Sequence, residues 1–156
     1  DAVKVTLSGE RADKSIDRVA GTFQLLDTAQ RFEYGPHGWP LYFGMAEAAR
    51  YLQSLGLDEI QAQAEAQADY LCQGIKPIAG VRILSPEQPD TRTSVVTFGI
   101  EGVPGQAIVD AFRKRNIITR ATHLRSDGVR VSVAFFTTRE ELDAVIEAVA
   151  AIAKKA

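Results

Sequence analysis

The sequence is poor in the residues from which disulfides and metal sites are built. It has one cysteine, Cys72, and two histidines, His37 and His123. A single thiol cannot form a disulfide within the chain, and neither histidine has a second ligand at helical spacing beside it. We therefore expect no metal site, and we expect Cys72 to be a small buried apolar residue on a helix.

Long apolar runs and a surplus of one charge are also absent. No segment reaches the roughly 20 apolar residues of a membrane-spanning helix, and the N-terminus lacks the regions of a signal peptide. The 18 Lys and Arg residues nearly balance the 20 Asp and Glu residues, for a net charge of −2. Because a basic surface supplies most non-specific nucleic-acid binding, we expect a cytoplasmic protein without nucleic-acid or membrane partners. The chain begins with Asp1 rather than Met, so we expect a processed or partial polypeptide.

What is present is the composition of a folded domain, with 156 residues of which 46% are hydrophobic. Apolar residues at helical spacing predict helices over residues 45–55, 58–75, 104–115 and 138–155. Gly56 and Pro77 end the first two. The last helix begins at a capping box, Thr138-Arg139-Glu140-Glu141.

Segments rich in β-branched and aromatic residues predict strands over residues 81–84, 93–100, 117–121 and 129–135. The pair Asp127-Gly128 favours a tight hairpin between the last two strands. A further strand is expected over residues 1–9, and the stretch from there to residue 34 shows no long period. Locally paired strands with interspersed helices predict an α+β fold, with a mainly antiparallel sheet and helices packed on one face.

One candidate site is the segment from residue 31 to residue 40, Arg-Phe-Glu-Tyr-Gly-Pro-His-Gly-Trp-Pro. Its glycines and prolines predict an irregular loop with exposed backbone donors, which suits the binding of an anion or a ring. A loop that merely leads into a helix and is anchored by Trp39 would explain the segment equally well.

A second candidate site is a group of basic residues near the last two predicted strands: Arg120, His123, Arg125 and Arg130. Arg130 lies between two valines on a strand, where a guanidinium group is costly unless it meets an anion such as a carboxylate. A salt bridge to Asp127 or Glu140, or an amphipathic edge strand, would explain Arg130 without a ligand.

Short segments that follow one another between residues 31 and 152 form a recognisable series: Arg31–Gly35 before Trp39-Pro40, Gly44–Ala48, Leu55–Ile60, Ala79–Leu84, Gly102-Val103, Ile117–Arg120, Val129–Ser132 and Thr138–Asp143. Together they resemble the C-terminal part of class V aminotransferases. That family includes isopenicillin-N-epimerase-like proteins and cysteine desulfurases, which use pyridoxal 5′-phosphate (PLP).

The resemblance implies that residues 39–156 are the small C-terminal α+β domain of a fold-type-I PLP enzyme. Residues 1–38 would be a remnant of the large cofactor-binding domain together with an interface loop. The resemblance also implies PLP as the cofactor of the intact enzyme, an amino acid or related amine as its substrate, and a homodimer formed through the Gly35–Trp39 loop.

Carried over position by position, Arg130 matches the arginine that clamps the substrate α-carboxylate, while Arg120 and His123 would line the mouth of the site. The loop after Gly35 matches the one that reaches the cofactor phosphate of the partner subunit. Many relatives have a threonine where this chain has Pro36, so the phosphate contacts implied here fall to the backbone of Gly35 and Pro36 and to His37.

Two departures from the family pattern bear on activity. The Schiff-base lysine of the family usually follows a histidine, and neither Lys4 nor Lys14 has that context. The short loop after Arg120 contains no cysteine, which disfavours desulfurase activity. We therefore predict part of a PLP-dependent aminotransferase-like enzyme that is catalytically incomplete as this chain, with no catalytic residue of its own. The alternative hypothesis is a non-catalytic α+β module for ligand binding or dimerisation.

Overall fold

The computed structural model describes residues 12–33, 35–88, 91–122 and 127–155. The chain forms two compact units, Asp1–Arg50 and Tyr51–Ala156. The domain division predicted after residue 38 stays a prediction.

The first unit contains a β-hairpin that the sequence did not predict. Strands β1 (Asp13–Asp17) and β2 (Thr22–Leu25) pair antiparallel, with Ile16 opposite Phe23. The carboxylate of Asp17 accepts hydrogen bonds from the backbone N–H groups of Val19 and Ala20, each at 2.9 Å, and these bonds hold the turn. A short 3₁₀ helix, η1 (Ala29–Phe32), follows, and helix α1 (Trp39–Leu55) begins in this unit. The strand expected over residues 1–9 lies outside the described residues.

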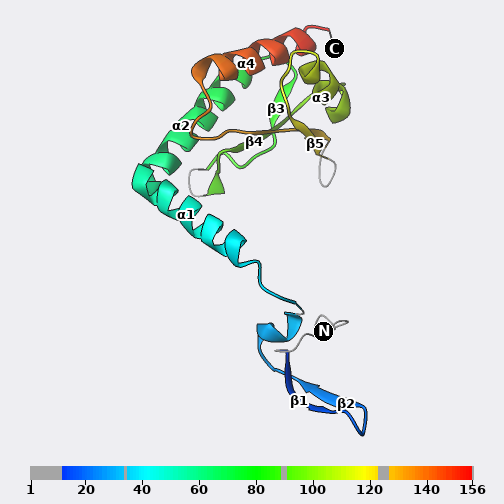
Figure 1. The fold of residues 1–156 in the computed structure, drawn as a ribbon. Helices are drawn as coiled ribbons and strands as arrows, with labels where there is room; N and C mark the ends of the chain where they lie inside the picture. Colours follow the sequence, from blue (N-terminus) through cyan, green and yellow to red (C-terminus); the bar gives the residue numbers. More distant parts are fainter. Residues whose placement is uncertain (1–11, 34, 89–90, 123–126, 156) are drawn as a thin grey trace. The chain divides into compact units, whose positions relative to one another are not determined.

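The second unit follows the predicted order of elements (Figure 1). Its elements are α2 (Leu57–Ile75), β3 (Val81–Ile83), β4 (Val95–Ile100), α3 (Gly105–Arg113), β5 (Arg120–Thr122), β6 (Gly128–Ser132) and α4 (Arg139–Ala153). The strands form one antiparallel sheet in the order β3-β4-β6-β5. This arrangement confirms the predicted α+β class.

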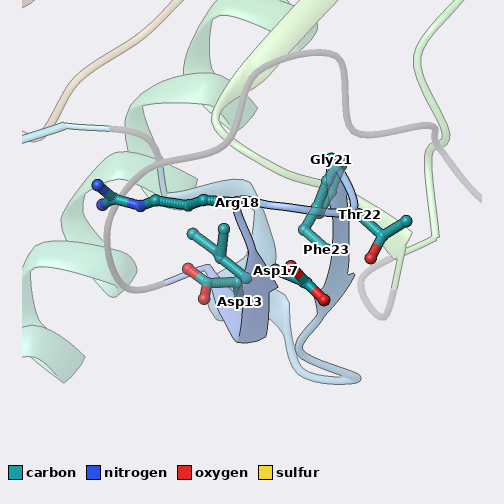
Figure 2. A pocket seen from close by; sticks show the side chains of 7 residues that line it. Asp13, Asp17, Arg18, Gly21, Thr22 and Phe23 are labelled. Atoms are coloured by element: carbon teal, nitrogen blue, oxygen red, sulfur yellow. The ribbon is translucent and has the colours of Figure 1, made fainter.

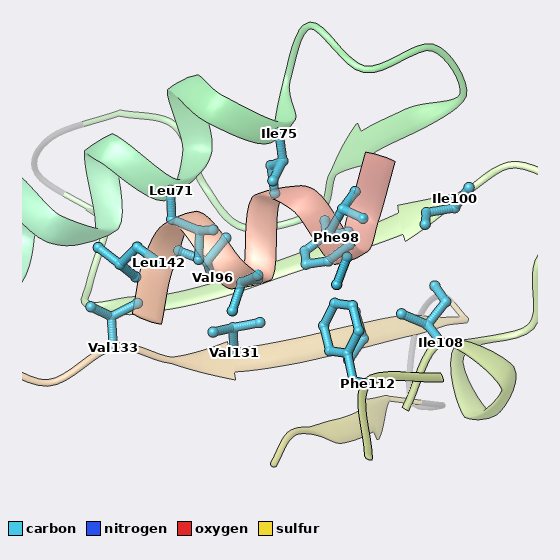
Figure 3. Packing of buried hydrophobic residues seen from close by; sticks show 14 of the residues in the cluster. Leu71, Ile75, Val96, Phe98, Ile100, Ile108, Phe112, Val131, Val133 and Leu142 are labelled. Carbon is cyan, nitrogen blue, oxygen red and sulfur yellow. The ribbon is translucent and has the colours of Figure 1, made fainter. Parts of the chain in front are cut away.

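Helices α2, α3 and α4 enclose a single core on one face of the sheet. Figure 3 shows Val96, Phe98 and Ile100 of β4 facing this core together with Phe112 of α3 and side chains of the other two helices. Phe98 and Phe112 are completely buried. Burying a side chain of this size contributes on the order of 1.5–3 kcal/mol, so these residues hold the helices against the sheet.

The last helix begins as its sequence predicts. The Thr138 hydroxyl accepts the backbone N–H of Glu141 at 3.3 Å, and the Glu141 carboxylate accepts the backbone N–H of Thr138 at 2.8 Å. This capping box satisfies two backbone donors that the first helical turn leaves without partners. Across the part of the chain that the structure describes, no helix combines the length and the apolar character needed to cross a membrane.

The strands differ from their predicted bounds at the edge of the sheet. Strand β5 begins at Arg120, although the residues from Ile117 onward have strand-like composition. The backbone N–H of Ile117 donates to the carbonyl of Phe112 at 3.0 Å, so the chain wraps the end of α3 before it can pair with β6. Asn116 in this wrap has a φ of 60°, which asparagine tolerates better than most residues.

Candidate functional site

The sheet places Arg120 and Arg130 directly opposite each other. Residue pairing across β5 and β6 matches Arg120 with Arg130, and pairing across β4 and β6 matches Thr97 with Arg130. Val129 and Val131 point into the core, so by alternation Arg130 lies on the other face of the sheet, where it is exposed. Arg120 is exposed as well. The two predicted arginines therefore lie side by side on the face of the sheet that the helices do not cover.

This pair carries two like charges at close range. Side chains directly opposite each other on antiparallel strands have Cβ atoms about 4.5–5.5 Å apart, and like charges at that separation destabilise the pair. Neither arginine forms an ion pair with any residue that the structure describes, so the predicted salt bridges of Arg130 to Asp127 or Glu140 are not formed. An anion between the two guanidinium groups would relieve the repulsion and accept bidentate hydrogen bonds.

The turn before β6 is attached to helix α3. The Asp127 carboxylate accepts the backbone N–H of Gly105, the first residue of α3, at 2.9 Å. Only a glycine fits there, because a Cβ on Gly105 would lie 2.2 Å from the carbonyl oxygen of Gly128. This contact fixes the start of the strand that carries Arg130. His123, the third predicted substrate-binding residue, lies outside the described residues.

The predicted phosphate-binding loop lies in the first unit. His37 is in this loop, with its Nε2 atom 3.3 Å from a carboxylate oxygen of Glu33. Its ring also contacts the rings of Trp39 and Tyr42, with centroids 5.3 and 6.0 Å away. These contacts hold the imidazole in place, although Trp39 itself is 60% exposed and anchors no core.

The other loop residues leave backbone accessible. A Cβ added to Gly35 would meet no atom within 4 Å, and Pro36 has no N–H to offer. An open glycine beside an imidazole suits the phosphate end of PLP, because backbone and imidazole N–H groups donate to phosphate oxygens. The described residues of the loop therefore fit the phosphate group of the cofactor.

The pyridine ring of PLP finds no comparable site among the described residues. The lysines there are in ion pairs or at helix ends. The ammonium group of Lys14 pairs with Asp27, and that of Lys76 pairs with Glu87 at 2.5 Å. The remaining described lysines, Lys114, Lys154 and Lys155, follow the last turns of α3 and α4. All of these lysines are exposed, so none has the enclosed setting of a lysine that forms a Schiff base.

The single cysteine is not in an activating environment. Cys72 is partly buried on α2, packed against the core. Burial raises the pKa of the Cys72 thiol. Since the thiolate is the nucleophile, a raised pKa makes this cysteine a poor one.

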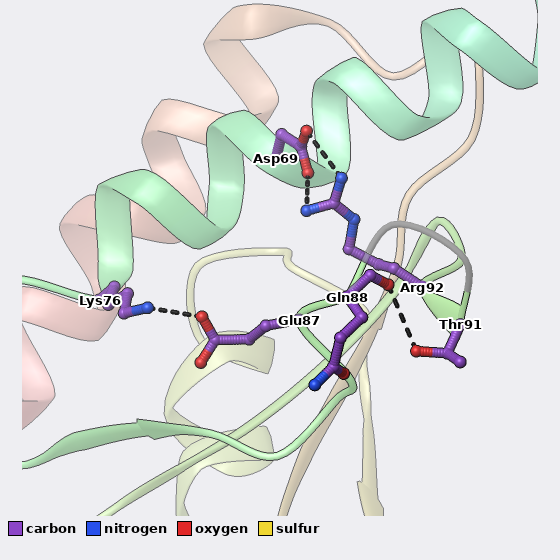
Figure 4. Close-up of polar contacts among 6 residues, drawn as sticks. All are labelled: Asp69, Lys76, Glu87, Gln88, Thr91 and Arg92. Carbon is purple, nitrogen blue, oxygen red and sulfur yellow. Dashed lines mark hydrogen bonds and ion pairs between the residues drawn. The ribbon is translucent and has the colours of Figure 1, made fainter.

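Ion pairs surround a small cleft beside Cys72, and Figure 4 shows them. The Arg92 guanidinium binds the Asp69 carboxylate through both of its terminal nitrogens, one of them at 2.9 Å, and Lys76 pairs with Glu87. These pairs tie the loop between β3 and β4 to helix α2. They neutralise one another, so the cleft has no surplus charge with which to bind an ion.

The β1–β2 hairpin forms a shallow hollow that sequence reasoning missed. Figure 2 shows its lining, which includes Asp13 and Asp17 of β1 and Thr22 and Phe23 of β2. Ile16 and Phe23 form a cross-strand pair, yet each is more than half exposed. Among the residues that can be described, no group of three His, Cys, Asp or Glu side chains is arranged to hold a metal ion.

Curated proteins that resemble this chain are named as desulfurases. A probable cysteine desulfurase from Mycolicibacterium paratuberculosis is 34% identical over 134 residues, covering 80% of this chain and 19% of that protein. A probable cysteine desulfurase 2 from Mycobacterium leprae is 28% identical over 130 residues, covering 77% of this chain and 31% of that protein. The chain thus spans about a fifth to a third of the length of these relatives.

Solved structures share the fold. The apo structure of cysteine desulfurase from Thermococcus onnurineus NA1 superimposes with a TM-score of 0.79 at 21% identity, covering 97% of this chain and 40% of that chain. A mutant of C-DES, a cystine C-S lyase, with glycine covalently linked to its PLP cofactor gives a TM-score of 0.72 at 21% identity. That match covers 95% of this chain and 38% of the other.

A family model that matches most of the sequence shows the family to which this chain belongs. The sequence model of the family described as Aminotransferase class-V matches residues 4–145. This range includes the loop at Gly35, both arginines of the sheet, helices α2 and α3, and the first part of α4. The chain belongs to the class V aminotransferases, a family of PLP-dependent enzymes.

Proposed function

We propose that this chain is the substrate-carboxylate-binding C-terminal part of a PLP-dependent class V enzyme that acts on an amino acid or a related amine. The observation that carries the proposal is the pairing of Arg120 with Arg130 on the uncovered face of the sheet, with no ion-pair partner for either among the described residues. A carboxylate is the ligand that matches the planar guanidinium group in a bidentate manner.

In this proposal Arg130 binds the α-carboxylate and fixes the orientation of the substrate, while Arg120 supplies a second positive charge from the opposite strand. Gly35 and His37 hold the cofactor phosphate, and they do so in a partner subunit of a homodimer. His123 is the third substrate-binding residue of this proposal. PLP, when bound, supplies the electron sink that stabilises charge developing next to the amino group.

The names of the relatives point to cysteine desulfurases, but we propose a different chemistry for this chain. Persulfide formation requires a thiolate close to the substrate. Residues 120–128 contain no cysteine, and Cys72 lies on helix α2 with a raised thiol pKa. The proposed reaction therefore takes place on the amine-bearing carbon of the substrate, with no sulfur transfer to a residue of this chain.

The carboxylate proposal is tested by NMR of the arginine side chains in the purified chain. We expect L-alanine to shift the Nε–H signals of Arg130 and Arg120 in a saturable manner. L-alaninamide has the same amine but no carboxylate, so it should shift neither signal. Arg130→Gln should abolish the response of Arg120 as well, because the clamp needs both guanidinium groups.

Arg82 provides a matched control. It is an exposed arginine on β3, and it pairs with Gly99 of β4 rather than with another cation. Arg82→Gln should leave the titration unchanged. Equal shifts at Arg82 and Arg130, or a response to L-alaninamide as large as that to L-alanine, would contradict the proposal.

A further inference from the structure

A groove lies between helices α3 and α4, within the second unit. It has a volume of about 590 Å³, and its apolar lining includes two alanines from each helix, Ala107 and Ala111 of α3 and Ala148 and Ala151 of α4. Sites of roughly 300–1,000 Å³ hold small organic ligands. The helices cover the core face of the sheet, so this groove is separate from the arginine pair on the uncovered face.

Cations continue the apolar face of each helix. Lys114 and Arg115 come three and four residues after Ala111, and Lys155 comes four residues after Ala151. Residues three or four apart share one face of a helix. All three cations line the groove together with the alanines. The groove is therefore apolar along the two helices and cationic where each helix ends.

These three cations have no anionic partner in the part of the chain that the structure describes. Each is exposed, and none forms an ion pair there. No Asp or Glu is among the described residues that line the groove, although the whole chain has a net charge of −2. A cation after the last turn of a helix offsets the helix dipole. The dipole does not require the cations of two helices to border one groove, and their surplus charge there suits an anion.

The cations stand at opposite ends of the groove, because α3 and α4 run in opposite directions. Figure 3 shows Leu142, near the start of α4, and Ile108, near the start of α3, toward opposite ends of the core. Arg115 also lines a second hollow whose other wall is formed by the first turns of α4. Lys155 follows the last turn of α4. Lys114 and Arg115 are therefore at one end of the groove, and Lys155 is at the other.

We propose that this groove binds an elongated organic dianion, with an apolar chain between two acidic groups. One acidic group lies near Lys114 and Arg115, the other lies near Lys155, and the chain lies against the alanines. Lys155 comes seven residues after Ala148, which corresponds to about 10 Å of helical rise. A ligand with one charged end would leave the cations at the other end without a partner. The proposal does not depend on carboxylate binding by the arginine pair of the sheet.

The test is NMR of the full chain, titrated with decanedioate. The methyl signals of Ala107, Ala111, Ala148 and Ala151 should shift in a saturable manner. Hexanedioate is too short to reach both ends, decanoate has one carboxylate and decanediol has none. Each of these three compounds should therefore bind more weakly, by about threefold or more. The signals that are followed lie on the helices, so this test can fail without affecting the arginine pair.

Substitution of the lining cations tests their role. Lys114→Gln and Lys155→Gln should each weaken decanedioate binding by about threefold or more, because each removes one ion pair. Arg113→Gln and Lys154→Gln are the matched controls, since they remove the same charge from the same helix ends at residues that do not line the groove. They should change binding by less than about twofold.

Circular dichroism checks the fold of each variant. Equal effects of Lys154→Gln and Lys155→Gln would overturn the proposal, because the cations would then act only through the general charge of the helix ends. Decanoate binding as tight as that of decanedioate, or no shift of any alanine methyl, would overturn it as well. So would a wild-type dimer that Lys155→Gln converts to a monomer, because the occupant would then be a second copy of this chain.

Discussion

At the scale of single residues, Arg130 shows how a strand can expose a charge between two buried neighbours. Val129 and Val131 are buried while Arg130 is exposed, because successive side chains on a strand point to opposite faces. The valines join the core, and the arginine is left free to meet a ligand. A guanidinium at either valine position would instead have to be buried.

The environment of Cys72 leads to a prediction about pH. Burial raises the pKa of its thiol, so the folded protein holds the neutral form to higher pH than an unfolded chain does. Alkylation by iodoacetamide should therefore be slow at neutral pH and rise with a midpoint above the usual thiol range. In denaturant the midpoint should fall to the usual range. Stability should correspondingly decrease as the pH rises through the pKa of the unfolded thiol.

The measurement is the rate of mass gain by the intact protein across a pH series. The chain has one thiol, so no second site contributes. A midpoint for the folded protein below that of the denatured protein would show that Cys72 is activated, which is contrary to the structure.

Single residues also show what the sequence could and could not predict. The capping box at Thr138 and the helix stop at Gly56 depend on neighbours in the chain, so their local sequence was sufficient. The Arg120–Arg130 pairing depends on strand register, which local sequence does not determine when both strands are short. The groove between α3 and α4 was missed because it depends on how α3 packs against a helix that follows two strands later in the chain.

At the scale of elements, the close approach of α2 and α4 depends on a glycine. A Cβ on Gly74 of α2 would lie 2.3 Å from the terminal methyl carbon of Ile146 on α4. About one turn earlier on α2, Tyr70 also joins the two helices. Its hydroxyl donates to the Asp143 carboxylate at 2.5 Å, and the Arg139 guanidinium lies 3.6 Å from the centre of its ring. A Cβ at residue 74 would therefore require the Ile146 side chain to move.

Gly74→Ala should therefore destabilise the protein by about 1–3 kcal/mol, the usual cost of overpacking a tight contact. Gly44→Ala is the control, since Gly44 is inside helix α1 and an added Cβ there meets nothing within 4 Å. Alanine favours a helix by about 1 kcal/mol relative to glycine, so this variant should be neutral or more stable. Urea unfolding monitored by circular dichroism measures both. Equal effects of the two substitutions would show that the contact with Ile146 does not matter.

The β1–β2 hairpin was not predicted from the sequence because its strands bury little of either face. Strand signals arise when one face of the strand is buried, and most of the residues of β1 and β2 are exposed. An isolated two-stranded hairpin is marginally stable in water. Its cross-strand pair, Ile16 and Phe23, is therefore apolar surface that the hairpin does not bury.

At the scale of the whole molecule, the chain should not retain PLP covalently. The described lysines are in ion pairs or at helix ends, and Lys4 lacks the preceding histidine of the family. After incubation with PLP and gel filtration, we expect no visible absorbance band from bound cofactor. Borohydride treatment of the filtered protein should leave its mass unchanged.

A retained band would show that a lysine of this chain does hold PLP. Lys4→Ala and Lys14→Ala test the two lysines that precede the phosphate-binding loop, and a band that survived both substitutions would contradict the expectation that this chain does not hold PLP. A band abolished by one of them would identify that lysine as the attachment point. The purified wild-type chain in the same buffer without PLP provides the baseline.

The repulsion between Arg120 and Arg130 couples the stability of the sheet to the binding of a ligand. At about 0.1 M salt the screening length is about 10 Å, which is longer than the distance between cross-strand neighbours, so solvent ions relieve the repulsion only in part. A carboxylate between Arg120 and Arg130 would relieve it fully and join the short edge strand β5 to β6. The substrate would then act as a structural element of the sheet, and the edge strand would be held most firmly while the site is occupied.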